Sequence, residues 1–272
     1  MIIAYWNTQR ASGLASRNLE PQARCLWCCQ QIGQWILRTI NAHQLRPSLI
    51  FLSEVSQGGG ALAPYLTALT GYPARYIAVG DRNANASPCS FIVMWREDLN
   101  PEIEIVGVSQ KRPMVRVRLP ELTVGAVHII ANPDKAPDEI FGDIADLDHE
   151  SQPAVLIGDM NYSWSRLKEA QPGTSTSLAA EIDRLFDWTP VHPDLQATFG
   201  KYTETRGLVT QVLDYMWKSR DVSRIETLAP YPNYNQWRQI DHAPIAYHVF
   251  RNDEDELMTD DEDDWGDDAR VR

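Results

Sequence analysis

Acidic, amide and imidazole side chains stand inside or directly beside the most apolar segments of this 272-residue sequence. They are Asn7 after IIAYW, Glu54 after LIFLS, His128 within LTVGAVHII, Asp159 and Asn161 after AVLIG, Asp214 within QVLDYMW, and Asp241 and His242 before APIAYHV. A buried carboxylate without a partner is costly, so such groups are usually hydrogen-bonded, ion-paired or metal-bound. We therefore expect these strands to converge at one sheet edge and to form one acidic pocket that contains histidines.

This inventory of side chains suits phosphoryl chemistry. Asn7, Glu54 and Asp241 offer hard oxygen ligands of the kind that Mg²⁺ prefers, with Mn²⁺ as a substitute. Such an ion can polarise a phosphoryl oxygen and lower the pKa of a bound water. Two histidines can supply acid–base steps, each contributing about 10²–10⁴-fold to the rate. A carboxylate beside each imidazole would fix its tautomer and favour its charged form.

Each of these residues also has a structural interpretation when it is taken alone. An aspartate at a strand end commonly forms a turn or caps a helix. A histidine within a strand is more often a hydrogen-bonded core residue than a catalyst, and the pair Arg112-Pro113 can simply lead into a strand. The indication of chemistry comes from the combination of these residues and their order along the chain.

Alternating apolar runs and amphipathic stretches define the elements that must position these side chains. Predicted strands cover residues 2–6, 49–55, 74–79, 90–95, 103–108, 114–119, 122–131, 154–158, 210–218, 223–228 and 243–250, and predicted helices cover about 20–43, 61–70, 135–149 and 175–187. Many strands with interspersed helices, some of the strands apolar on both faces, indicate a layered α/β body.

The net charge of −12 is concentrated at the end of the chain, because residues 252–272 hold 11 acidic and two basic residues. The sequence therefore predicts a catalytic domain over residues 1–251 and an acidic, disordered tail over 252–272. The near-neutral body excludes a strongly basic protein that coats nucleic acid, but it is compatible with an enzyme that contacts nucleic acid at a cleft. The tail could keep the protein soluble, cover its own cleft or bind a basic partner.

The cysteines and the N-terminus give only general indications. Cys25, Cys28 and Cys29 lie on one helical stripe, and without a second such pair they predict core packing rather than a zinc site. No apolar run is long enough for a membrane span, and MIIAYWNTQR does not resemble a secretory signal. We therefore expect a cytoplasmic protein.

The motifs together resemble the endonuclease/exonuclease/phosphatase superfamily over residues 2–250. The motifs that carry the resemblance are WN at Asn7, SEV at Glu54, RP at Arg112, the strand histidine His128, GDMN at Asp159 and Asn161, LDY at Asp214, and IDH at Asp241 and His242. The segment around His128, which lies between RPMVRVRL and IIANPDKAP, is most similar to deoxyribonuclease I and to the catalytic subunit of cytolethal distending toxin. The fold implied by the resemblance is an α+β four-layer sandwich, in which two packed mixed β-sheets are flanked by helices.

The resemblance also implies a role for each matching residue. Glu54 corresponds to the principal Mg²⁺ ligand, and Asn7 and Asp241 complete the environment of the metal and the phosphate. Asp159 and Asn161 correspond to the pair that orients the attacking water and holds a phosphate oxygen. The remaining roles are Asp214 as the carboxylate paired with His242, His128 as the acid that protonates the leaving oxygen, and Arg112 as a phosphate contact.

The expected function is that of a Mg²⁺-dependent phosphodiesterase, an endonuclease that cleaves DNA by in-line attack of a metal-activated water. Two alternatives remain open from the sequence. The same residues would serve a phosphoinositide phosphatase or a lipid phosphodiesterase, because a fold and its core motif do not determine the substrate. A catalytically inactive binding protein on this scaffold is the other alternative.

Overall fold

The computed structural model describes residues 1–8, 34, 46–55, 59–78, 90–107, 112–171, 175–203, 207–228 and 242–250. The predicted helix over 20–43, apart from residue 34, lies outside these described residues. The same holds for Asp241, for all four cysteines and for the tail 252–272. No helix in the described part of the chain is long and apolar enough to span a membrane.

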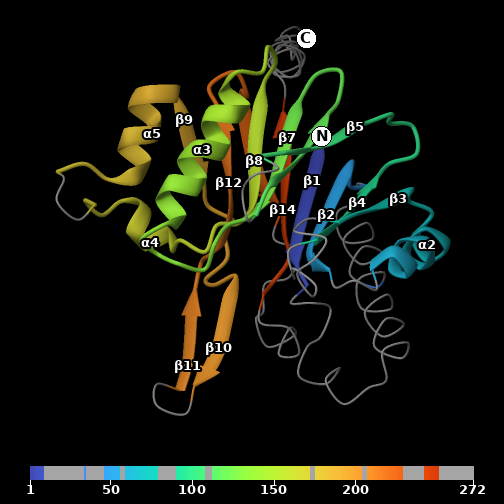
Figure 1. Cartoon of the computed structure of the whole chain (residues 1–272), viewed down its shortest axis with the longest axis horizontal. Coiled ribbons are helices and arrows are strands. Elements are labelled where there is room, and N and C mark those ends of the chain that lie inside the picture. The colour runs from blue at the N-terminus through green and yellow to red at the C-terminus, as the bar shows by residue number, and fades with distance from the viewer. Residues whose placement is uncertain are drawn as a thin grey trace, which may run out of the picture.

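Two six-stranded mixed sheets form the centre of the molecule (Figure 1). The first sheet has the strand order β13 (Arg224–Leu228), β14 (Ile245–Phe250), β1 (Ile2–Asn7), β2 (Leu49–Val55), β4 (Ser90–Trp95) and β3 (Ala74–Ile77). The second has the order β5 (Glu102–Val106), β6 (Met114–Arg118), β7 (Thr123–His128), β8 (Ala154–Asp159), β12 (Asp214–Ser219) and β9 (Trp188–Val191). Each sheet contains one parallel pair, β1–β2 in the first and β7–β8 in the second, and its other pairs are antiparallel.

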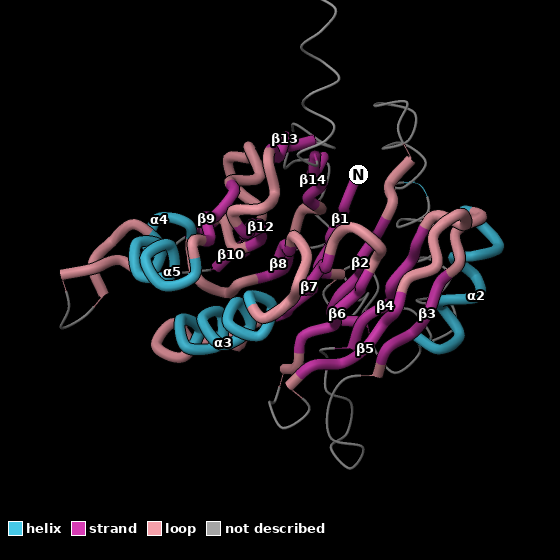
Figure 2. The backbone as a smooth tube through the Cα atoms, turned by 90° about the horizontal axis from the view of Figure 1, so that it is seen from above, coloured by secondary structure: helices cyan, strands magenta, loops and turns pink. Residues whose placement is uncertain are grey.

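Helices cover the outer faces of the two sheets, which gives the predicted four layers (Figure 2). The described helices are α2 (Gly59–Thr70), α3 (Ala136–Asp148), the short α4 (Trp164–Leu167) and α5 (Leu178–Phe186). Helix α2 packs on the first sheet, and α3 and α5 pack on the second. Helix α3 also makes the crossover that a parallel pair requires, here between β7 and β8. The predicted fold class is therefore confirmed.

Alternation along the strands divides the apolar residues between the layers. In β1, Ile3 and Tyr5 face the second sheet, whereas Ala4 and Trp6 belong to the cluster beneath α2. The remaining inner strands follow the same rule, so the central core lies between the two sheets. This division matters for the site, because a polar residue that continues an inward-facing stripe is directed into the space between the sheets.

The structure differs from the predicted elements in the region before β12. The single strand predicted over 210–218 is two strands, because the chain breaks at Val212 and Leu213 between β11 (Gly207–Gln211) and β12. The sequence also missed α4, β9 and β10 (Phe199–Thr203). Strands β10 and β11 form a two-stranded hairpin, which projects from the body beyond the two sheets (Figure 1).

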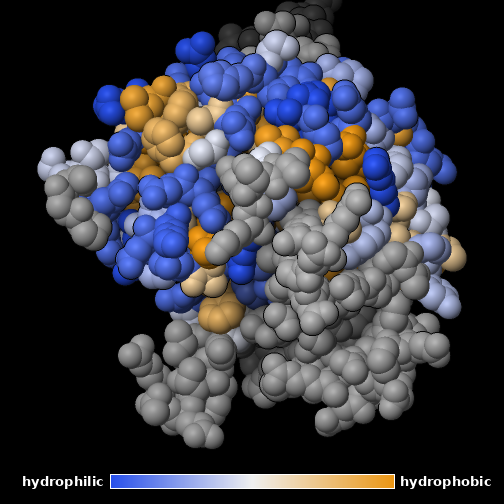
Figure 3. All heavy atoms as spheres, viewed as in Figure 1, coloured by the Kyte–Doolittle hydropathy of each residue, from blue (hydrophilic) through white to orange (hydrophobic). Residues whose placement is uncertain are grey.

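The surface seen in Figure 3 is mostly hydrophilic where the structure describes it, with apolar atoms gathered in patches. Over all described residues, the large apolar side chains that are clearly exposed are Tyr65, Leu69, Ile105 and Leu185. They lie on three different elements, which is ordinary for a folded surface.

Candidate active site

Four of the predicted site residues are terminal residues of strands and face the space between the sheets. Asn7 continues the stripe of Ile3 and Tyr5 at the end of β1. His128 and Asp159 continue the corresponding stripes at the ends of the parallel strands β7 and β8, and Asp214 begins β12 next to them. The register pairs Asp159 with both His128 and Asp214, which brings the three residues side by side.

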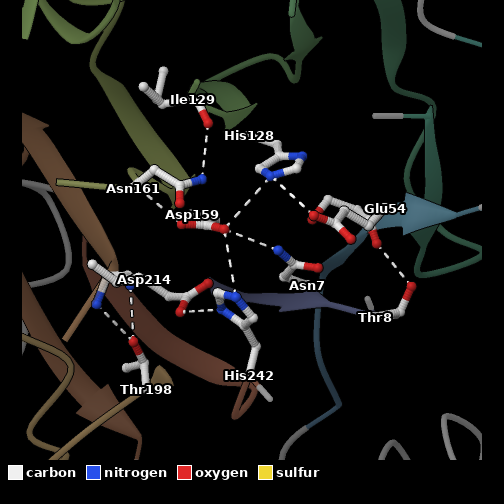
Figure 4. A network of polar contacts seen from close by, with 12 residues as sticks. Asn7, Thr8, Glu54, His128, Ile129, Asp159, Asn161, Thr198, Asp214 and His242 are labelled. Carbon is white, nitrogen blue, oxygen red and sulfur yellow. Dashed lines mark hydrogen bonds and ion pairs between the residues drawn. The ribbon is translucent and has the colours of Figure 1, made fainter. Parts of the chain in front are cut away.

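The expectation that one sheet edge collects all the site residues was wrong. Asn7, Glu54 and His242 belong to or precede strands of the first sheet, whereas His128, Asp159 and Asp214 belong to the second. Because the two sheets pack face to face, the end of the space between them gathers residues from both (Figure 4). The site is therefore placed by sheet packing as well as by strand order.

Glu54 reaches the site through an irregularity of β2. Strict alternation from Phe51 and Ser53 would direct Glu54 to the side of Leu52, which packs beneath α2. Instead, the register shifts between Leu52 and Val55, and Glu54 adopts a left-handed backbone with φ of +53°. Bulges of this kind re-aim a side chain and are frequent beside active sites. The result is a distance of 3.2 Å between Glu54 Oε1 and His128 Nε2.

Hydrogen bonds to Ser53 hold this irregular strand end against β1. The backbone nitrogen and the hydroxyl of Thr8 both donate to the Ser53 carbonyl, at 3.0 and 2.8 Å. The hydroxyls of Tyr5 and Ser53 lie 2.6 Å apart. These bonds fix the residue that precedes Glu54, and so they help to hold the unusual backbone of Glu54.

Asp159 is the centre of the polar network (Figure 4). Its Oδ2 accepts a hydrogen bond of 2.9 Å from Asn7 Nδ2, and its Oδ1 accepts one of 2.9 Å from the backbone nitrogen of Asn161. The same Oδ2 lies 3.6 Å from His128 Nε2 and 3.7 Å from His242 Nε2. Burial raises the pKa of Asp159 to about 6, although the neighbouring His242 opposes this shift.

Asp214 and His242 form a close carboxylate–imidazole pair. His242 Nδ1 lies 2.8 Å from Asp214 Oδ2, and both side chains are buried. A carboxylate accepts hydrogen bonds, so this contact places a proton on Nδ1 and directs Nε2 towards Asp159. The indole of Trp6 donates to the His242 carbonyl at 3.0 Å and so anchors the backbone of the histidine.

His128 links this network to Arg112. Arg112 Nη1 is 3.1 Å from His128 Nε2 and also donates to the carbonyl of Ile129. Burial, together with the charges of Arg112 and His242, lowers the pKa of His128 well below its usual value. Its buried Nδ1 has no hydrogen-bond partner within the described part of the chain.

Asn161 is held directly beside Asp159. It has a left-handed backbone with φ of +46°, and its Nδ2 donates to the Ile129 carbonyl at 2.9 Å. The Ile129 carbonyl thus links Asn161, Arg112 and the strand that carries His128. The loop after β7 is fixed further by a hydrogen bond of 2.9 Å from the Ile130 nitrogen to Glu139 of α3.

The donor set fits a divalent cation. Oxygen and nitrogen atoms of Asp159, Asp214 and His242 lie within 4.8 Å of one another, and all three residues are buried. Beside this group, Asn7 turns its amide nitrogen to Asp159 and its oxygen towards the side of Glu54, whose carboxylate lies next to His128 (Figure 4). Two buried carboxylates that are only partly neutralised by hydrogen bonds favour the binding of a cation. The residues that could hold it are Asn7, Glu54, Asp159, Asp214 and His242.

The structure thus brings eight of the nine predicted site residues into one network. These are Asn7, Glu54, Arg112, His128, Asp159, Asn161, Asp214 and His242. Asp241, the predicted ninth, lies outside the described residues. The sequence reasoning missed Thr198, whose hydroxyl accepts hydrogen bonds from the nitrogens of Leu213 and Asp214, and a lone threonine in a loop gives no signal by which to find it.

Several solved structures share this fold. Truncated TDP2 from Caenorhabditis elegans is 13% identical, with a TM-score of 0.56 over 92% of this chain and 96% of that one. The human Nocturnin catalytic domain is 14% identical, with a TM-score of 0.55 over 92% and 93% of the two chains. ANGEL2, described as a 2',3'-cyclic phosphatase, is 14% identical, with a TM-score of 0.57 over 90% and 94%.

All three proteins are members of the endonuclease/exonuclease/phosphatase superfamily. The chain has the fold of this superfamily. The resemblance drawn from its motifs is thereby confirmed at the level of the fold. Neither a protein-family model nor a curated protein matches the sequence.

Proposed function

We propose that this protein is a divalent-metal-dependent phosphoester hydrolase, and specifically a Mg²⁺-dependent endonuclease that cleaves DNA. The observation that carries the proposal is the position of Asp159 between two imidazoles. Its Oδ2 lies 3.6 Å from His128 Nε2 and 3.7 Å from His242 Nε2, and Asn7 donates to the same oxygen. In this arrangement Asp159 can accept a proton, and the buried His128 and His242 beside it can each donate one when they are protonated.

Asp159 is suited to orient the attacking water and to accept its proton. A general base works best when its pKa lies near the operating pH, and burial raises the pKa of Asp159 to about 6. The Asn161 nitrogen and Asn7 Nδ2 hold the two carboxylate oxygens in place. The carboxylate therefore needs little rearrangement before it can align a water with a phosphorus atom.

The two imidazoles would act on the other oxygens of the phosphate. With Asp214 holding its Nδ1–H, the imidazolium form of His242 can use Nε2–H to donate a hydrogen bond to a phosphate oxygen as negative charge grows there. Arg112 lies beside His128 and can attract a phosphate to it. A bound phosphate would offset the charge of Arg112 and favour a proton on His128, which can then pass to the leaving oxygen.

Mg²⁺ is the cation that we propose for the site, held by Glu54 and Asn7, with Asp241 as a further predicted ligand. When bound, it would polarise a phosphoryl oxygen and lower the pKa of the attacking water. Glu54 lies 3.2 Å from His128 and at the edge of the network. Its carboxylate can therefore bind a cation without displacing Asp159 from its hydrogen bonds.

DNA is the proposed substrate on two grounds. The segment around His128 resembles deoxyribonuclease I and the cytolethal distending toxin subunit. In addition, a TDP2 structure from D. rerio with this fold, at 12% identity and a TM-score of 0.57, is described as a complex with a single-strand DNA product. A near-neutral body outside the acidic tail predicts that binding rests on a few phosphate contacts, so the salt dependence would be shallow.

The proposal is tested by incubating the purified protein with supercoiled plasmid in Mg²⁺ or in EDTA. We expect nicking in Mg²⁺ only, and its loss in His128→Ala and in Asp159→Ala. His149→Ala and Asp134→Asn are matched controls, because both residues are exposed and lie outside the network. They should nick at the rate of the wild type.

Folded wild-type protein that leaves plasmid intact would refute the DNA proposal. Cleavage of a phosphoinositide or of another phosphoester, with the same loss in both site variants, would retain the hydrolase and reassign its substrate. If the protein hydrolyses none of these phosphoesters but still binds one of them, the inactive binding protein would be favoured.

A further inference from the structure

Thr198 ties together two distant segments of the chain at the root of the β10–β11 hairpin. It is fully buried, and its hydroxyl accepts hydrogen bonds from the nitrogens of Leu213 and Asp214, each at 2.9 Å. Its carbonyl accepts a hydrogen bond of 2.7 Å from the nitrogen of Ala243. Its own nitrogen donates to the Gln211 carbonyl at 3.0 Å.

These bonds end on the backbone immediately beside the carboxylate–imidazole pair. Asp214 itself is bound to the Thr198 hydroxyl, and Ala243 directly follows His242. The next residue of the hairpin, Phe199, forms a backbone bridge to His242, and the two ring centroids lie 5.0 Å apart. Thr198 therefore contacts Asp214, and Phe199 contacts His242.

The break between β11 and β12 explains why a hydroxyl is needed here. Val212 and Leu213 connect the hairpin to β12 and are not paired as strand residues. The Leu213 and Val212 carbonyls accept bonds from Met160 and Trp164, whereas the Leu213 nitrogen donates to the Thr198 hydroxyl. Buried backbone donors must find an acceptor, and one hydroxyl oxygen with two lone pairs serves two of them.

We infer that Thr198 is a positioning residue for the Asp214–His242 pair, which acts by fixing both backbone segments from one point. The inference rests on the proposed function, because the pair matters for catalysis only if the site hydrolyses phosphoesters. The hydroxyl fixes the start of β12, where Asp214 stands, and the carbonyl fixes the segment that carries His242. Together these contacts set the 2.8 Å separation of Asp214 Oδ2 and His242 Nδ1.

Two substitutions test the hydroxyl of Thr198 and the shape of its side chain separately. Thr198→Val keeps the shape and removes the acceptor, whereas Thr198→Ser keeps the acceptor and removes a methyl group. Thr123→Val is the matched control, because Thr123 is also fully buried, its hydroxyl also accepts a hydrogen bond, and it begins β7 at the end opposite His128.

The first measurement is steady-state phosphodiester cleavage in Mg²⁺. We expect Thr198→Val to lower kcat by about 10-fold or more with little change in KM, because a displaced His242 loses part of the roughly 10²–10⁴-fold that an acid–base group contributes. Thr198→Ser and Thr123→Val should stay within about 3-fold of the wild type, since positioning is retained in both. A kcat of Thr198→Val equal to that of the wild type would overturn the inference.

The second measurement needs no activity. The proton on His242 Nδ1 is buried and hydrogen-bonded, so it should give a downfield ¹H NMR resonance that disappears in His242→Gln. We expect Thr198→Val to shift or broaden this resonance, and Thr198→Ser to preserve it. If the wild type hydrolyses nothing but the resonance behaves in this way, the proposed function fails and the positioning role stands.

Two outcomes of the second measurement would refute the inference. An unchanged resonance in a folded Thr198→Val variant would show that the pair keeps its geometry without the hydroxyl. If Thr198→Val fails to fold, Thr198→Ser provides the test. This variant keeps the hydroxyl, so loss of the His242 resonance in it would show that the hydroxyl does not hold the Asp214–His242 pair.

Discussion

Replacing Asp159 by asparagine should stabilise the metal-free protein while abolishing its activity. Asp159 is fully buried, and burial raises its pKa from 3.8 to about 6, so the folded state penalises the ionised carboxylate at neutral pH. The asparagine side chain has the same shape without the charge, and its one oxygen keeps one of the two hydrogen bonds that Asp159 accepts from Asn7 and Asn161, so the loss of the other offsets part of the gain. The activity is lost because an amide cannot accept the proton of a water.

The magnitude follows from the two pKa values. One pKa unit is worth about 1.4 kcal/mol, so ionising Asp159 costs the folded state up to about 3 kcal/mol. Because the folded state binds the proton more tightly, the free energy of unfolding of the wild type falls as the pH rises from 3.8 to about 6, and is level above that pH. The stability of Asp159→Asn relative to the wild type should thus rise by about 1.4 kcal/mol between pH 5 and pH 8.

Urea unfolding followed by tryptophan fluorescence in EDTA, at pH 5 and pH 8, measures this difference. Asp134→Asn is the control, because Asp134 is exposed, and it should shift the free energy of unfolding by less than about 0.5 kcal/mol. Asp159→Asn that is less stable than the wild type at pH 8, or whose advantage does not grow with pH, would refute the reasoning about the buried charge.

Four further substitutions should have separable effects. Asp214→Asn should lower kcat by about 10²–10⁴-fold, with little change in KM, because His242 loses the carboxylate that fixes its tautomer; kinetics at saturating Mg²⁺ would measure this. Glu54→Gln should weaken Mg²⁺ binding in calorimetry while leaving the metal-free protein as stable as the wild type, since Glu54 is only partly buried. Gly158→Ala should lower the free energy of unfolding, because a Cβ there would lie 2.1 Å from the Val127 carbonyl between β7 and β8. Gly142 lies within α3, and a Cβ there meets open space, so Gly142→Ala should raise the free energy of unfolding by about 0.5–1 kcal/mol. Urea unfolding measures both changes.

The alternation of apolar residues was sufficient to predict much of the site. Asn7, His128 and Asp159 each end a strand whose inward residues are apolar, so each is carried into the space between the sheets. Apart from β9, β10 and the run over 210–218, the described strands were predicted within a few residues, because runs that are buried on both faces are continuous in sequence. The fold class followed from the motifs, and the structure confirms it.

The parts that could not be predicted depend on contacts between distant residues. Glu54 reaches the site only because β2 is irregular after Leu52, and no local sequence signal marks a positive φ at a glutamate. Thr198 acts through the backbone of Asp214, and the break at 212–213 that requires it lies inside an apolar run that resembles one continuous strand. Such features are set by the packing of the two sheets rather than by local propensity.

Cleavage of a short DNA duplex in ¹⁸O-labelled water with Mg²⁺ tests the central claim most directly. If a water oriented by Asp159 attacks phosphorus, the wild type should release products that carry one ¹⁸O on the new phosphate, and Asp159→Asn should release none. Products with the label on the sugar hydroxyl, or equal cleavage by Asp159→Asn, would contradict the account, as would a folded wild-type protein that leaves the duplex intact.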